Sequence, residues 1–128
     1  MNKYFELMIK NLANLFSFFF VRFYLIILIG GNIFLWLAVY YINKTVSQDL
    51  VALHYNINFG VDLIGHVNKI FIIPSISLLT ILLNTILIFI LQSHKHFKFI
   101  AYLLLSACVM INLFLLLGLM SIYLVNFR

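Results

Sequence analysis

The stretch IFIIPSISLLTILLNTILIFILQ, residues 70–92, decides the fold, because it contains no Asp, Glu, Lys, Arg or His. A helix rises about 1.5 Å per residue, so this run is long enough to cross a hydrocarbon core of about 30 Å. No water in that core can satisfy an open backbone, and the apolarity is continuous rather than alternating as in a β-barrel strand. The stretch is therefore predicted to be a transmembrane helix, with Pro74 in its first turns, where a missing backbone N–H costs little.

Two further runs, residues 23–42 and 99–125, are equally apolar and also contain no Asp, Glu, Lys, Arg or His. The composition of the whole chain is also that of a membrane protein, since 66% of its residues are hydrophobic, only 9% are charged and the mean hydropathy is +1.17. This composition lies far outside that of soluble domains. We predict an all-α membrane protein with three transmembrane helices in one membrane domain, residues 1–128, which is solvated by the lipid bilayer.

The segment before the first span, residues 1–21, is predicted to be an amphipathic helix lying in the membrane interface. Its polar residues recur every three or four positions, and they are Lys3, Glu6, Lys10, Asn14 and Ser17. The alternative is that this segment simply extends the first span. Arg22 favours a helix break or a snorkelling point, because its guanidinium must reach the headgroups.

Basic residues next to the spans predict the orientation. Five basic residues lie on the same side of the membrane as the N-terminus: Lys3, Lys10, Arg22, Lys95 and Lys98. Three lie on the other side: Lys44, Lys69 and Arg128. We therefore expect a multi-pass protein of the cell membrane with a cytoplasmic N-terminus, a basic cytoplasmic turn at 93–98 and an outward loop at 43–69. Since the basic residues sit beside apolar runs, the sequence pI near 9.5 does not indicate nucleic-acid binding.

The outward loop is predicted to contain a short extended extracytoplasmic segment between the first two helices. Apolar and polar residues alternate from Leu53 to Phe59, which is typical of a strand, and Gly60 ends the pattern. A two-stranded element alone is marginally stable, so such a segment needs the helices or a partner to hold it. The candidate recognition residues of this loop are His54, Tyr55, Asn56, Asn58, Asp62 and His66.

A metal or acid/base site built from His54, Asp62 and His66 is one interpretation, and it would make the chain a membrane enzyme acting on lipid or envelope precursors. The sequence has no HExxH or CxxC spacing to support it. The alternative is that the two histidines are hydrogen-bonded groups at headgroup level and that Asp62 caps a turn or a short helix. We favour this alternative and expect no catalytic residues, no metal and no cofactor.

Each span carries one asparagine near its middle: Asn32, Asn84 and Asn112. They lie about 14, 12 and 20 Å from the cytoplasmic ends of their spans, so at least two can meet. We predict interhelical hydrogen bonds worth about 1 kcal/mol each, aided by small residues where backbones approach, namely Gly30, Gly31, Thr80, Thr85 and Ser106. The alternative is that the amides line the solute path of an oligomeric channel or carrier.

The string LHYNINFGVDLIG, residues 53–65, is followed by the apolar run that begins IFIIP at Ile70. It resembles a group of small bacterial multi-span membrane proteins of unknown function that carry similar His-Tyr-Asn and Phe-Gly-x-Asp-Leu-Ile-Gly strings. The resemblance covers residues 51–126 and implies the bacterial cytoplasmic membrane, but no activity. His66 stands where these proteins usually have an aromatic residue.

These observations predict a non-catalytic subunit or assembly partner of a membrane complex. The expected partner is another membrane protein or further copies of the same chain.

Overall fold

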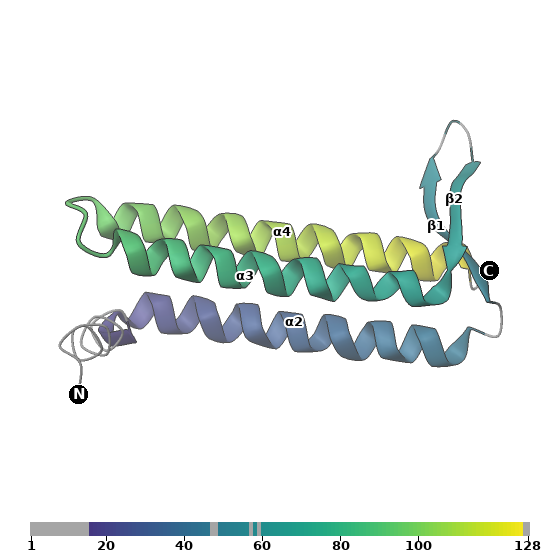
Figure 1. Ribbon diagram of the computed structural model, residues 1–128, viewed down its shortest axis with the longest axis horizontal. Coiled ribbons are helices and arrows are strands. Elements are labelled where there is room, and N and C mark those ends of the chain that lie inside the picture. Colours follow the sequence, from purple (N-terminus) through teal and green to yellow (C-terminus); the bar gives the residue numbers. More distant parts are fainter. Residues whose placement is uncertain (1–15, 47–48, 57, 59, 127–128) are drawn as a thin grey trace.

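The computed structural model describes residues 16–46, 49–56, 58 and 60–126, and within them long helices lie side by side with a small hairpin at one end (Figure 1). The predicted interfacial helix falls largely outside the described residues. In chain order the elements are α2 (Phe19–Thr45), β1 (Leu50–Asn56), β2 (Gly60–His66), the 3-10 helix η1 (Val67–Phe71), α3 (Ile72–Leu91) and α4 (Phe97–Asn126). Among these residues three helices are long and apolar enough to cross a membrane, which confirms the three predicted apolar spans.

α2 and α4 extend beyond the apolar runs from which they were predicted, whereas α3 lies within the run 70–92. α2 begins at Phe19 and passes through Arg22, whereas the backbone break lies at Phe18, whose φ of −75° and ψ of 115° are extended. The predicted break at Arg22 is therefore displaced by one turn. Arg22 is exposed in the first turn of α2, where its long side chain can reach the headgroups without interrupting the helix.

The buried residues of α2 recur at alternating intervals of four and three residues: Val21, Leu25, Leu28, Asn32, Leu35, Val39 and Ile42. This spacing is the heptad seam by which helices pack at shallow crossing angles. The corresponding stripe on α3 contains Pro74, Ser77, Ile81 and Ile88. The same seams that bury apolar side chains therefore also bury a few polar ones.

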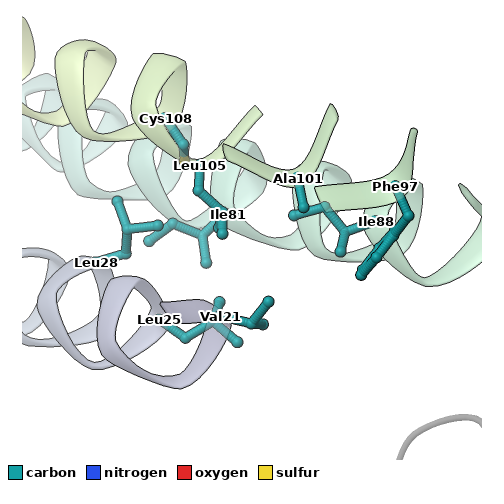
Figure 2. Close-up of a cluster of buried hydrophobic side chains, with 9 residues drawn as sticks. All are labelled: Val21, Leu25, Leu28, Ile81, Ile88, Phe97, Ala101, Leu105 and Cys108. Atoms are coloured by element: carbon teal, nitrogen blue, oxygen red, sulfur yellow. The ribbon is translucent and has the colours of Figure 1, made fainter. Parts of the chain in front are cut away.

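Two apolar clusters form the core of the bundle. Near the α3–α4 turn, side chains from α2, α3 and α4 point toward one another (Figure 2): Val21, Leu25, Leu28, Ile81, Ile88, Phe97, Ala101, Leu105 and Cys108. Near the hairpin, a second cluster consists of Leu35, Val39, Ile42, Ile70 and Leu119. The region between the two clusters, at the level of Asn32, is where the polar residues of the seams meet.

β1 and β2 pair antiparallel, with Leu50 opposite His66 and Asn56 opposite Gly60. Gly60 has a φ of +75°, a left-handed conformation that glycine adopts without strain, and it starts the return strand. The alternation in the sequence predicted only one extended segment that ends at Gly60. The structure instead continues with a second strand, because the glycine reverses the chain rather than ending the β-structure.

The end of α4 holds the hairpin in place. The Asn126 side chain accepts a hydrogen bond from the Ala52 backbone N–H (2.8 Å) and donates one to the Ala52 carbonyl (2.9 Å). At the base of the hairpin the Val67 N–H donates to the Asp49 carbonyl (3.1 Å), and Val51 is buried. The amide of Asn126 thus pairs with β1 as a further strand would, which supplies the support that a two-stranded element lacks on its own.

Replacing Asn126 with Leu should release the hairpin from α4. The change leaves both backbone groups of Ala52 without their helix partner, and each lost hydrogen bond is worth about 1 kcal/mol. We expect amide hydrogen exchange in residues 50–56 to speed up about tenfold or more, measured by mass spectrometry in detergent micelles. Asn68→Ala is the control, since it removes only the exposed bond between Asn43 and Asn68 (2.8 Å), and equal exchange in both variants would contradict the clamp.

Candidate functional site

A chain of hydrogen bonds crosses the middle of the bundle and joins α2, α3 and α4. The Asn32 side-chain nitrogen donates to the Ser77 hydroxyl (2.8 Å) and to the Pro74 carbonyl (2.9 Å). The Ser77 hydroxyl donates to the side-chain oxygen of Asn112. The Asn112 nitrogen donates to the Cys108 carbonyl one turn earlier in α4 (3.0 Å). Residues Asn32, Ser77 and Asn112 are called the polar layer below.

The polar layer lies between the two apolar clusters, with Asn32 and Ser77 buried and Asn112 half-buried. Asn32 is 6% exposed and Ser77 is fully buried. On α2 the layer follows Leu28 of one cluster and precedes Leu35 of the other. In such an environment a polar group without a partner costs more than the bond that it would form, and no buried side-chain nitrogen or oxygen among the described residues lacks a partner.

Asn84 does not take part in the polar layer. Its side-chain nitrogen donates to the Thr80 carbonyl of its own helix (2.9 Å), and its side chain lies beside the Cys108 thiol. Ser77 is seven residues away, about 10 Å along the helix axis. The structure therefore brings together two of the three predicted asparagines and leaves the third in a local bond.

Ser77 and the Pro74 carbonyl were not predicted as partners. The sequence nevertheless indicates that Ser77 faces the other helices, because helical spacing places it on the same stripe of α3 as Ile81 and Ile88. Within this chain no close approach occurs at Gly30 and Gly31, since both are exposed and no neighbouring atom lies within 4 Å of where a Cβ would stand, and a close approach between copies of the chain stays a prediction. These glycines lie away from the seam that Asn32 occupies.

The remaining small residues also act within the bundle. Thr80 and Thr85 donate to carbonyls of their own helix, those of Ile76 and Ile81. Ser106 on α4 lies 3.4 Å from the Tyr24 hydroxyl on α2, so it links two helices on the side of the polar layer nearer the α3–α4 turn.

The hairpin separates the histidines of the predicted outward site. His54 is opposite Leu63, whereas His66 is opposite Leu50. His54 follows Leu50 by four positions in β1, which is roughly 13 Å along the strand. Within the described part of the chain, no three His, Cys, Asp or Glu side chains are grouped closely enough to hold a metal ion.

The structure describes the other residues of that predicted segment as follows. Tyr55, Asn56 and Asp62 have their backbones in β1 or β2, and their side chains lie outside what the structure describes. Asp62 lies inside β2, so its backbone is not at the helix start that was predicted for it. Asn58 is exposed in the turn between the strands.

The hairpin exposes apolar side chains on its second strand. Val61, Leu63 and Ile64 are 43%, 53% and 62% exposed. Because β1 is held by Asn126, β2 is the strand farther from this clamp. An exposed strand with apolar side chains is a common docking surface for another protein chain.

Comparison of the chain with protein-family models, with curated proteins and with solved structures finds no match.

Breaking the polar layer should loosen the bundle. Ser77→Ala removes the hydroxyl that joins the two amides, so we expect a loss of about 1 to 2 kcal/mol in the free energy of unfolding, measured by titration of mixed micelles with a denaturing detergent. Asn84→Leu is the matched control and should cost no more than about 0.5 kcal/mol, because it removes a bond within α3 and only a weak contact with the Cys108 thiol of α4. A larger loss for Asn84→Leu than for Ser77→Ala would contradict this assignment.

Proposed function

We propose that this chain is a non-catalytic subunit or assembly factor of a larger complex in the bacterial cytoplasmic membrane. In this proposal the N-terminus is cytoplasmic, the helices anchor the chain, and the hairpin lies on the extracytoplasmic side as the docking surface for a membrane-protein partner. The second strand, Gly60–His66, is the part that contacts the partner.

The observation that carries this proposal is the attachment of the hairpin to the end of α4. Asn126 holds both backbone groups of Ala52, and a Cβ added at Gly65 would lie 2.7 Å from the Leu53 side chain, so the base of the hairpin is closely packed. The apolar side chains of β2 are nonetheless exposed. A surface that is already ordered before binding loses little conformational entropy when a partner docks, which favours recognition.

The polar layer supports the same proposal. Its donors are bonded within the chain, from α2 through α3 to α4, so the bonds run across the bundle rather than along it. Such an arrangement fits a stable anchor. It is less suited to a solute path, which needs polar groups in succession along the membrane normal.

An enzymatic role receives less support from the hairpin. Acid/base or metal chemistry needs side chains that converge on one reacting atom, within hydrogen-bonding reach of it. His66 lies at the base of the hairpin ladder, opposite Leu50, whereas His54 lies farther along it, opposite Leu63. The docking function requires only the exposed apolar residues that the hairpin presents.

Ile64→Lys should abolish partner binding without unfolding the chain. Ile64 is 62% exposed, so the bundle tolerates the change, whereas a buried charge in an apolar interface costs several kcal/mol. We expect the partner that copurifies with the tagged chain in mild detergent to fall at least tenfold in quantitative mass spectrometry. Thr45→Lys adds the same charge at the adjacent end of α2 and should leave copurification unchanged. A monomeric particle with no copurifying membrane protein, or equal recovery with Ile64→Lys, would reject the proposal.

Labelling of introduced cysteines tests the proposed orientation of the chain in the membrane. In a Cys108→Ser background, Val61→Cys should react with a membrane-impermeant maleimide on intact cells, because it is exposed on the hairpin. His96→Cys, which is exposed in the turn between α3 and α4, should react only after the cells are permeabilised. The reverse pattern would place the hairpin in the cytoplasm.

A further inference from the structure

A groove of about 630 Å³ lies beneath the hairpin, where β1 and β2 meet the helices. Its size is within the range of small-molecule sites, and its lining is almost entirely apolar. The lining residues are Leu53, Leu63, Asn68, Lys69, Ile70, Ile72, Ile73 and Ile122. The groove therefore offers an aliphatic surface with one positive charge at its edge.

The Lys69 side chain is directed along the hairpin. A Cβ built on Gly65 would lie 3.1 Å from the Lys69 Cδ and 3.6 Å from its Nζ, so the lysine stem occupies the space that the glycine leaves. The ammonium group thus lies beside β2, above the isoleucines of η1 and α3. No Asp or Glu is among the lining residues of this groove in the described structure.

The depth of the groove matches the boundary between hydrocarbon and headgroups. α2 and α4 contain 27 and 30 residues, so they are about 40 and 45 Å long, against a hydrocarbon core of about 30 Å. Their ends therefore extend into the headgroup region, and the hairpin lies at one of these ends (Figure 1). Lys69 is in η1, which directly precedes α3 at this end of the bundle, so a bilayer centred on the helices would bring phosphates to its ammonium and acyl chains to Ile72 and Ile73.

We propose that this groove binds one anionic phospholipid from the leaflet on the hairpin side. An acyl chain packs against Ile72, Ile73 and Ile122, and the phosphate pairs with the Lys69 ammonium. A zwitterionic lipid would present a second, positive group for which the lining offers no carboxylate. Charge complementarity therefore selects an anionic headgroup, as in other basic pockets at helix ends.

Native mass spectrometry of the purified full chain with dioleoylphosphatidylglycerol or dioleoylphosphatidylcholine tests the proposal. We expect the first phosphatidylglycerol to bind about tenfold more tightly than phosphatidylcholine, because a charge-assisted bond to phosphate is among the strong polar contacts. Lys69→Gln should remove this preference and Lys69→Arg should keep it. The control is Lys44→Gln, since Lys44 lies at the same end of the bundle but over the Tyr40 ring, 5.8 Å from its centroid, and it should change the ratio less than about twofold.

Equal binding of the two lipids, or an equal loss in the Lys44 and Lys69 variants, would overturn the proposal, because either result indicates surface charge alone. A second measurement identifies the occupant in cells. A diazirine amino acid at Ile72, which is 62% exposed on the groove, should yield an adduct with the mass of an anionic phospholipid. An adduct with another protein at this position would assign the groove to a partner and overturn the lipid site. Both measurements are independent of the Ile64 experiment, since Ile64 does not line the groove.

Discussion

The structure depends on the need of amides in hydrocarbon to find partners. Leucine and isoleucine seams pack almost equally well after a shift of one helical turn, so they define which faces meet but not the register. The bonds from Asn32 to Ser77 and from Ser77 to Asn112 form in one alignment only. A shift of one turn would break both bonds and leave the Asn32 and Asn112 amides with at most bonds to their own helices, as Asn84 has, a free-energy cost that altered apolar packing would have to offset. The polar layer therefore sets the relative heights of the helices, as single buried polar residues do in coiled coils.

Through α4, this alignment of the helices also determines where the hairpin is held. Asn112 and Asn126 lie two heptads apart on that helix, so they occupy the same seam. When Asn112 meets Ser77 in the middle of the bundle, Asn126 arrives at the level of β1, where it pairs with Ala52. The same type of side chain thus performs two tasks on one helix face. One amide aligns the helices inside the bilayer, and the other fixes the hairpin at its boundary.

The sequence predicts the apolar helices because their backbones have no other way to satisfy their hydrogen bonds in lipid, and this constraint acts on each segment separately. It also predicts that amides at similar depth meet, which holds for Asn32 and Asn112 through Ser77. Ser77 was missed because a serine in a helix usually bonds to its own backbone, as Ser75 does with the Phe71 carbonyl. The second strand and the Asn126 clamp depend on tertiary contacts, since β2 has no clear alternation before its pairing with β1 is known.

The two faces of β2 give the hairpin a means of coupling the proposed lipid to the proposed partner. Neighbouring strand residues point to opposite faces, and Leu63 lines the groove while Ile64 does not. A lipid that packs against Leu63 restrains the hairpin from below, so a partner that binds at Ile64 meets a strand with less freedom to lose. By thermodynamic linkage the partner then strengthens lipid binding by the same factor. Anionic lipid and partner would therefore be cooperative ligands of a two-stranded sheet that contacts both, without any change in the helices beneath it.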